Sequence, residues 1–280
     1  MLEALEQPTG PFSLRLSARL AGDATRTFRE GTLTAVLPGG ELVRARQRPD
    51  GGVLLQAASE AGLERLRFVL ALHDDHSEFL ERFAYDPLLG RATRVLKGLR
   101  PLRLASVAHA LLRALAGQLV TWQQSKEIER SVIRRVSARH ESGLYEPPLG
   151  EALGRLGTGE LRRLGLHARR AAALVRLCRS VELERLRALP TYSVVKRLTR
   201  EPGLGPWSAG VVCLQGLGRY EHGLVGDLGL VKLCSRGQPR RVDVSETAAL
   251  LEPYGEWAGL ASVYLLAALG RGLIGQRAAA

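Results

Sequence analysis

The stretch Glu201-Pro202-Gly203-Leu204-Gly205-Pro206-Trp207-Ser208-Ala209 separates two segments whose apolar residues recur at helical spacing. The spacing predicts one helix over 191–200, which ends at the Pro-Gly pair, and a second helix over 207–217. The two glycines of the turn permit a positive φ and allow their N–H groups to approach a ligand closely. Because the first N–H groups of a helix lack intrahelical partners, the turn predicts a site for an anion, here a phosphate.

A lone acid, Asp227, follows Gly205 by 22 residues within the apolar run Gly223-Leu224-Val225-Gly226-Asp227-Leu228-Gly229-Leu230. By itself, Gly-x-Gly between two helices is an ordinary tight turn. With the proline and tryptophan that follow, and with the acid at this interval, the turn resembles the hairpin of the helix-hairpin-helix DNA glycosylases and their catalytic aspartate. Within that superfamily the chain is most similar to 3-methyladenine DNA glycosylase II, the AlkA type.

Three further stretches carry the same resemblance, and together with the hairpin they cover residues 85–270 approximately. They are Ala116-Gly117-Gln118-Leu119-Val120-Thr121, Leu164-Gly165-Leu166-His167-Ala168-Arg169-Arg170-Ala171 and Glu252-Pro253-Tyr254-Gly255-Glu256-Trp257-Ala258. The first is similar to the helix end and turn that face the lesion. The second is similar to a connection of the helical core, and the third to the start of the last helix.

The resemblance assigns catalysis to Asp227. A carboxylate beside C1′ stabilises the positive charge that develops on the sugar as the N-glycosidic bond breaks, and it orients or deprotonates water. Leu119 is implied as the side chain that fills the gap left by a flipped base. The implied contacts to the DNA backbone are Gly203, Leu204, Gly205, Trp207, Ser208 and Lys232, with Lys126 as a further phosphate contact. The implied base pocket contains Trp207, Trp122 and Tyr264.

Two of these residues also have a structural interpretation. Asp227 stands where an N-cap would precede a helix over 228–233, and capping is compatible with catalysis. Trp207 either offers a face on which an electron-poor base stacks or packs in the core and locks the hairpin. In bifunctional relatives a nucleophilic lysine occupies the position of Trp207. The resemblance therefore implies hydrolysis that leaves an abasic site without β-elimination lyase cleavage.

The chain departs from the family pattern around the expected pocket. Val211 and Leu228 stand where the AlkA type can carry aromatic residues, and Gly255 and Glu256 stand where the family often has Arg-Ser. Aromatic residues make up only 5% of the chain. Two alternatives to the excision of 3-methyladenine or 7-methylguanine therefore stay open: the same fold acting on hypoxanthine or uracil, and a non-catalytic protein that binds damaged DNA.

The hydrophobic pattern predicts an α+β fold. Apolar residues alternate from Pro11 to about Gln56, with turn signals at 38–40 and 49–52, and this pattern predicts an antiparallel sheet. The alternation begins with Phe12, Leu14, Leu16, Ala18 and Leu20. A helix over 60–72 would cover one face of the sheet. Beyond Ser77 the period becomes helical, with long helices expected over 105–119 and 122–139.

Three parts are expected from this pattern and from the resemblance. An N-terminal mixed α/β domain covers 1–84. A helical subdomain that carries the catalytic Asp covers 85–101 plus 220–280. A second helical subdomain over 102–219 carries the helix-hairpin-helix.

Composition favours double-stranded DNA as the partner. Lys and Arg number 40 against 28 acids, which gives a net charge of +12 and a pI of about 10.4. Such a chain gains affinity for a polyanion by counterion release, although GC-rich coding also produces Arg-rich proteins. The sequence has no run of ~20 apolar residues and no signal segment at its start, so we expect a bacterial cytoplasmic protein associated with the nucleoid through DNA and not with membranes. The resemblance implies a monomer.

No side-chain metal site and no cofactor are expected. His73-Asp74-Asp75-His76 looks like a set of metal ligands, but four adjacent residues cannot converge on one ion from regular structure, so we interpret them as a polar loop before a helix at Ser77. The odd number of widely spaced cysteines, Cys178, Cys213 and Cys234, predicts reduced thiols and no iron-sulfur cluster. By resemblance, the backbone carbonyls of the hairpin can hold a monovalent cation.

Overall fold

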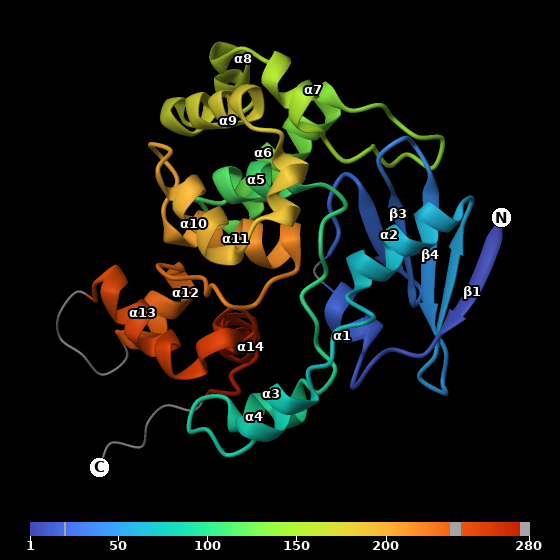
Figure 1. The fold of residues 1–280 in the computed structure, drawn as a ribbon, viewed down its shortest axis with the longest axis vertical. Coiled ribbons are helices and arrows are strands. Elements are labelled where there is room, and N and C mark those ends of the chain that lie inside the picture. Colours follow the sequence, from blue (N-terminus) through green and yellow to red (C-terminus); the bar gives the residue numbers. More distant parts are fainter. Residues whose placement is uncertain (20, 236–241, 275–280) are drawn as a thin grey trace.

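The computed structural model describes residues 1–19, 21–235 and 242–274 and has an antiparallel sheet beside a larger array of helices (Figure 1). The α+β class predicted from the sequence is confirmed. Among the described residues, no helix is both long enough and apolar enough to cross a bilayer.

The sheet has five strands in the order β1-β5-β4-β3-β2, and every neighbouring pair is antiparallel. The strands are β1 (Leu2–Glu6), β2 (Arg26–Arg29), β3 (Thr32–Val36), β4 (Leu42–Gln47) and β5 (Val53–Ala57). The predicted turns join β3 to β4 and β4 to β5, with positive φ at Gly39, Gly40 and Gly51. Helix α2 (Glu60–Leu70) packs on β4 and β5, as expected, and Ser59 caps it by accepting a hydrogen bond from Gly62 N.

One part of the predicted sheet is wrong. The alternation over 12–20 was expected to form a strand, but Leu14–Ala18 is the short helix α1. Ser13 caps this helix through its hydroxyl, which accepts from Leu16 N. Leu14 and Ala18, four residues apart, lie together in the core below the sheet, whereas Leu20 lies outside the described residues. The strand β1, which the sequence analysis did not predict, pairs with β5 instead.

The remaining described elements are helical. They are α3 (Ser77–Arg82), α4 (Gly90–Val95), α5 (Val107–Ala116), α6 (Trp122–Val136), α7 (Gly150–Arg155), α8 (Thr158–Arg163), α9 (Ala168–Ser180), η1 (Leu183–Ala188), α10 (Thr191–Thr199), α11 (Pro206–Val211), η2 (Val212–Leu217), α12 (Leu228–Cys234), α13 (Val244–Leu251), η3 (Glu252–Trp257) and α14 (Ala258–Gly270).

Three hydrophobic cores organise these elements. The first lies under the sheet. The second is formed by the helices from α5 through η2, and Ala24 from the loop before β2 also belongs to it. The third joins residues 79–99 to the helices after 230, and Phe79 and Phe83 belong to it. A cavity opens where the hairpin, the α5–α6 turn and the loop before α12 meet, and Val211 and Leu224 of the second core line it.

Candidate active site

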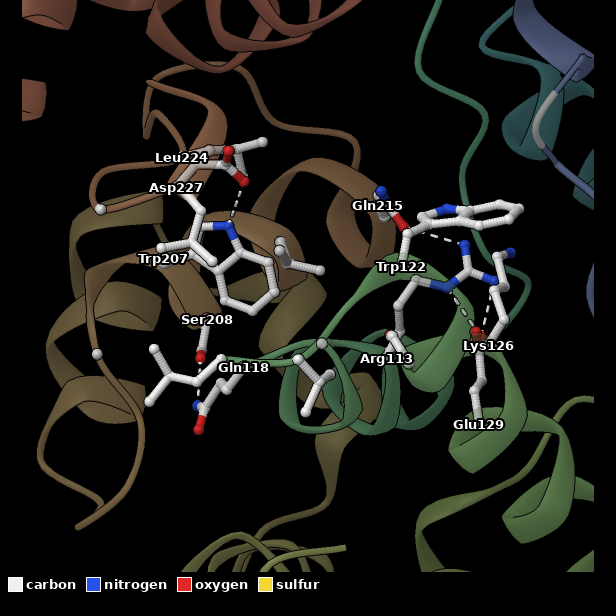
Figure 2. A pocket seen from close by; sticks show the side chains of 18 of the residues that line it. Arg113, Gln118, Trp122, Lys126, Glu129, Trp207, Ser208, Gln215, Leu224 and Asp227 are labelled. Carbon is white, nitrogen blue, oxygen red and sulfur yellow. Dashed lines mark hydrogen bonds and ion pairs between the residues drawn. The ribbon is translucent and has the colours of Figure 1, made fainter. Parts of the chain in front are cut away.

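A cavity of about 620 Å³ brings most of the predicted site residues together (Figure 2). Its size is in the range of protein pockets that enclose small ligands. The lining comes from α5, α6, the hairpin, η2 and the start of α12. It comprises Arg113, Gly117, Gln118, Leu119, Val120, Trp122, Ser125, Lys126, Glu129, Gly203, Gly205, Trp207, Ser208, Val211, Gln215, Leu224, Gly226, Asp227 and Leu228.

The hairpin is a tight turn between α10 and α11. Gly203 has φ of +102°, a conformation that favours glycine, but Gly205 has φ of −101° and ψ of −177°. The turn therefore uses the freedom of glycine to adopt a positive φ at Gly203 and not at Gly205, whose backbone is extended. A Cβ built on Gly205 would meet no atom within 4 Å, so this position is open toward whatever approaches the turn. Leu204 is buried and anchors the turn in the second core.

Gln118 ties the hairpin to the α5–α6 turn. Its Nε2 donates to the carbonyl of Gly203 at 2.8 Å and to Oγ of Ser208 at 2.7 Å. The next residue, Leu119, has φ of +52° and is 81% exposed at the rim of the cavity. An apolar side chain in a left-handed backbone conformation, held out into solvent, is costly in isolation. The turn thus presents a fixed, protruding leucine beside the hairpin.

Asp227 combines the two roles considered from the sequence. It is the N-cap of α12, and its Oδ1 accepts a hydrogen bond of 2.7 Å from Gly229 N. Its Oδ2 accepts a hydrogen bond of 2.9 Å from Nε1 of Trp207. The carboxylate is half-buried and lines the cavity. Both oxygens are therefore oriented by neighbours while the group faces a space that a nucleotide can enter.

Trp207 is held in place on both sides. The hydrogen bond to Asp227 fixes its indole nitrogen, and a Cβ built on Gly117 would come within 2.8 Å of its Cη2 atom. The ring still lines the cavity. Trp122, at the first turn of α6, is 60% exposed and lies on the other side of the cavity (Figure 2).

Two expected contacts are wrong. Tyr264 does not reach the cavity: it is fully buried in the third core, and its hydroxyl donates to the carbonyls of Leu96 and Leu99. Lys126 is not a surface phosphate contact. It is only 7% exposed, and its Nζ donates to the carbonyl of Gly22 at 3.0 Å. Lys232, by contrast, is exposed on α12.

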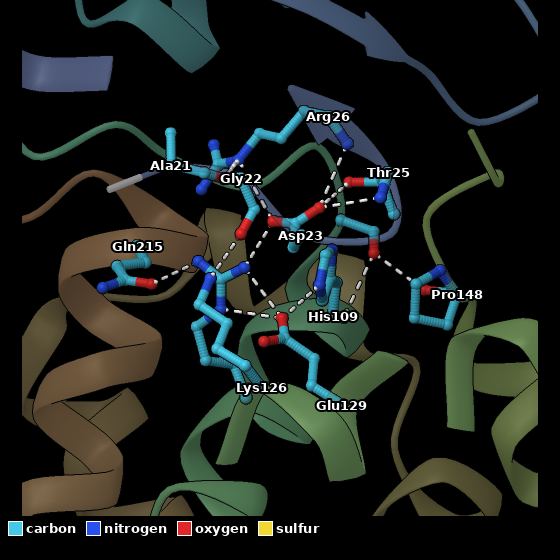
Figure 3. Close-up of polar contacts among 12 residues, drawn as sticks. Ala21, Gly22, Asp23, Thr25, Arg26, His109, Lys126, Glu129, Pro148 and Gln215 are labelled. Atoms are coloured by element: carbon cyan, nitrogen blue, oxygen red, sulfur yellow. Dashed lines mark hydrogen bonds and ion pairs between the residues drawn. The ribbon is translucent and has the colours of Figure 1, made fainter. Parts of the chain in front are cut away.

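Sequence reasoning missed a buried charged network behind the cavity (Figure 3). Its hub is Arg113, whose guanidinium bonds Glu129, Asp23 and Gln215. His109 Nε2 shares Oε1 of Glu129 at 2.7 Å, and Arg26 pairs with Asp23. In the sequence, His109, Arg113 and Glu129 fall on helix faces that otherwise carry buried apolar residues, whereas Asp23 and Arg26 lie outside the helices and give no such signal.

The network shifts the ionisation of its members. Burial opposes charge on the carboxyls of Asp23 and Glu129, but the surrounding cations outweigh it. The pKa of Glu129 falls to about 2, chiefly through Arg113 and His109, and the pKa of Asp23 is also lowered, through Arg26 and Arg113. Burial lowers the pKa of His109, although its hydrogen bond to Glu129 acts in the opposite direction. Burial, followed by Arg113, lowers the pKa of Lys126 to about 8.

The described residues offer one cluster with metal-ligand geometry. Ligand atoms of Asp23, His109 and Glu129 lie within 4.8 Å of one another. The guanidinium of Arg113 bonds both carboxylates, so an arginine already supplies the positive charge there. Within His73-Asp74-Asp75-His76, Asp75 accepts from Ser77 N at the start of α3 and Asp74 pairs with Arg103, as expected of a polar loop. His76 departs from that expectation, because it is buried against the rings of Tyr220 and Trp257.

No family model matches the chain. A curated relative, DNA-3-methyladenine glycosylase of Bacillus subtilis, is 24% identical over 204 residues, which cover 69% of this chain and 67% of the relative.

Several solved structures match nearly the whole chain. The 3-methyladenine DNA glycosylase from Archaeoglobus fulgidus superposes with a TM-score of 0.78 and 22% identity, covering 96% of this chain and 98% of that one. The 8-oxoguanine glycosylase/lyase of Clostridium acetobutylicum, solved with double-stranded DNA, gives a TM-score of 0.79 and 17% identity with the same coverage. The resemblance found in the sequence is confirmed: the chain has the fold of the helix-hairpin-helix DNA glycosylases.

Proposed function

We propose that the protein is a monofunctional DNA glycosylase that removes alkylated purines, of the 3-methyladenine and 7-methylguanine type, from duplex DNA and so initiates base excision repair. The observation that carries this proposal is the position of Asp227, a carboxylate oriented by Trp207 and Gly229 at the wall of a nucleotide-sized cavity beside the hairpin.

Residues at the rim of that cavity would bind the DNA. The hairpin presents Gly203 and Gly205 with the start of α11 behind them, an arrangement suited to a phosphate. Leu119 protrudes next to it and fills the space that a flipped base vacates. The net charge of +12 adds affinity that falls as salt rises. Double-stranded DNA that contains a damaged base is therefore the proposed partner.

The chemistry requires little beyond Asp227. As the N-glycosidic bond lengthens, positive charge builds on the sugar, and the carboxylate stabilises it at short range in a site sheltered from water. The same carboxylate orients or deprotonates the attacking water. An alkylated purine leaves readily because it already carries positive charge. The proposal accordingly requires no cofactor and no general acid.

The proposal that the protein lacks lyase activity rests on which amines can reach the sugar and attack it. Trp207 occupies the hairpin position where the bifunctional relatives have their lysine. The single lysine that lines the cavity among the described residues is Lys126, and its Nζ is hydrogen-bonded to Gly22 on the side of the cavity away from Asp227 (Figure 2). An amine there does not lie beside the C1′ that Asp227 faces.

A second candidate is the same reaction on a deaminated purine such as hypoxanthine. The observation that favours it is the cavity lining, in which Val211 and Leu228 replace aromatic residues and charged side chains occupy one end. A cationic base gains most from stacked aromatic rings, whereas a neutral base gains more from hydrogen bonds.

The test is incubation of the purified chain with methylated duplex DNA, followed by mass identification of the released bases. Strand breaks are scored before and after alkali, and a borohydride trap reports any covalent amine intermediate. Release of 3-methyladenine or 7-methylguanine, with breaks only after alkali and no trapped adduct, is the expected result. Breaks before alkali, or a trapped adduct, would contradict the monofunctional assignment. Tight binding without release of any base would indicate a non-catalytic DNA-damage-binding protein.

A further inference from the structure

The end of the cavity away from Asp227 is formed by Arg113, Lys126, Glu129 and Gln215, which we call the charged wall (Figure 2). Arg113 comes from α5, Lys126 and Glu129 from α6, and Gln215 from η2. Asp227 lines the same cavity, so a nucleotide whose sugar lay at Asp227 could extend its base toward this wall. No role in the reaction at Asp227 accounts for these four side chains.

The hydrogen bonds within the charged wall fix the direction of each group. Arg113 has only donors, so the oxygen of the Gln215 carboxamide, Oε1, faces it at 3.1 Å. The amide nitrogen Nε2 of Gln215 then points away from Arg113 (Figure 2). Arg113 Nε and His109 Nε2 both bond to Oε1 of Glu129, at 2.8 and 2.7 Å.

These contacts leave one acceptor and two donors uncommitted among the described residues. Oε2 of Glu129 accepts no hydrogen bond from them, although this side chain is only 1% exposed and lines the cavity (Figure 3). Nε2 of Gln215 makes no hydrogen bond to them, and Nζ of Lys126 makes one, to Gly22. Because Glu129 lines the cavity, a ligand that supplies a donor to this oxygen gains a hydrogen bond to a charged group.

The loop before β2 holds the charged wall rigid. Gly22 accepts from Lys126, and the carboxylate of Asp23 accepts from Arg113. Asp23 is itself bonded by Thr25 and Arg26. The N-terminal domain thus fixes side chains of the helical part that face the cavity, which is the preorganisation that selective hydrogen bonding requires.

We propose that Lys126, Gln215 and Glu129 bind the flipped base and select a purine with a lactam edge, which is a ring carbonyl beside a ring N–H. This proposal rests on the glycosylase function proposed above. The carbonyl oxygen has two lone pairs and accepts from both Lys126 and Gln215, while the N–H donates to Oε2 of Glu129. A ring nitrogen, as in the amidine edge of an adenine, accepts only one hydrogen bond. Hypoxanthine and 7-methylguanine have the lactam edge, and 3-methyladenine lacks it.

Methylated DNA supplies a comparison with matched charge, because 7-methylguanine and 3-methyladenine are both cationic lesions in the same substrate. In mildly acidic buffer, where both keep their charge, the ratio of their release rates cancels differences in protein concentration and in DNA affinity. The informative variants are Gln215→Glu, which keeps an acceptor for Arg113 and replaces the free donor by an acceptor, and Lys126→Met. The control is Arg134→Met, which removes a charge from an exposed position on the same helix.

Gln215→Glu and Lys126→Met are each expected to shift the release ratio toward 3-methyladenine by about tenfold, while Arg134→Met leaves the ratio unchanged. A charged wall that merely ties the N-terminal loop to the helices would lower both release rates together. An unchanged ratio in both variants would therefore overturn the proposal even if the protein is an active glycosylase.

Binding provides a readout that does not depend on catalysis. In the Asp227→Asn background, duplexes that contain hypoxanthine or 1,N⁶-ethenoadenine compare two neutral bases, of which only hypoxanthine has the lactam edge. Tighter binding of the hypoxanthine duplex, lost on Gln215→Glu, supports base reading even if the wild-type chain releases no base. Equal affinity for the two duplexes would overturn the proposal, whereas an absence of base release alone would overturn only the glycosylase function.

Discussion

The indole nitrogen of Trp207 donates a hydrogen bond of 2.9 Å to Oδ2 of Asp227 and so joins the hairpin to the cap of α12. Helix α11 and the loop before α12 also pack closely at Gly210 and Gly223, where a Cβ on Gly210 would approach the Gly223 carbonyl to 2.6 Å. The hairpin and the loop that carries Asp227 are therefore joined by a hydrogen bond and by close backbone packing.

Replacement of Trp207 by Phe is expected to slow excision about 10- to 100-fold, because a hydrogen bond to a charged group stabilises by about 1.5–3 kcal/mol and orients the carboxylate. Trp207→Phe keeps an aromatic ring in the cavity, so the affinity for undamaged duplex should stay unchanged. Single-turnover excision and DNA binding, measured on the same preparation, check both expectations. A rate equal to that of the wild type would show that Trp207 only packs the hairpin.

The two hairpin glycines should respond differently to alanine. Gly205 has an extended backbone and an open surrounding, so Gly205→Ala should fold normally yet weaken duplex binding, because its methyl group occupies the space where a phosphate approaches. Gly203→Ala should also lower the free energy of unfolding by about 1 kcal/mol, since φ of +102° is unfavourable for alanine. Denaturant unfolding and salt-dependent binding separate the two effects. Wild-type DNA affinity for Gly205→Ala would remove the turn from the interface.

Leu119→Ala should reduce excision from duplex DNA and leave the free energy of unfolding almost unchanged, because the side chain is 81% exposed. The loss should be smallest for a lesion placed opposite an abasic site, where a flipped base leaves less stacking to replace. Tyr85→Ala, at a residue that is 95% exposed and does not line the cavity, is the matched control. An equal loss of excision rate for paired and unpaired lesions would argue against the insertion of Leu119 into the base stack.

The buried amine of Lys126 predicts a pH dependence of stability. Burial, followed by Arg113, lowers its pKa from the ordinary value of 10.5 to about 8. Between these values the unfolded chain binds more protons at this site than the folded chain, so the free energy of unfolding rises with pH by about 3 kcal/mol over that window. The difference between the wild type and Lys126→Met, followed by urea unfolding from pH 7 to 10.5, should show this rise. A pH-independent difference would mean that Lys126 titrates normally.

Features that depend on a few neighbouring residues could be predicted from the sequence. The hairpin, the cap at Asp227 and the helices that flank them depend on glycine, proline and N-cap preferences over a few residues, and the structure has them where they were expected. The short helix α1 was missed because five residues with every second position apolar fit a strand as well as one turn of helix.

The charged wall could not be predicted in the same way. Arg113, Lys126, Glu129 and Gln215 are polar residues on three helical segments, and such residues usually face solvent. Their burial depends on the loop around Asp23, which lies 90 residues from Arg113 in the chain. The same dependence on tertiary packing explains Tyr264, whose place in the third core is set by the carbonyls after α4.

The most direct test of the central claim is single-turnover release of alkylated bases from methylated duplex DNA by the wild type and by Asp227→Asn. Asparagine keeps the shape and an oxygen that can cap Gly229, so folding and DNA affinity should persist while base release falls by at least about 1,000-fold. Release by Asp227→Asn at the wild-type rate, with normal folding and binding, would contradict the assignment of Asp227 as the catalytic residue.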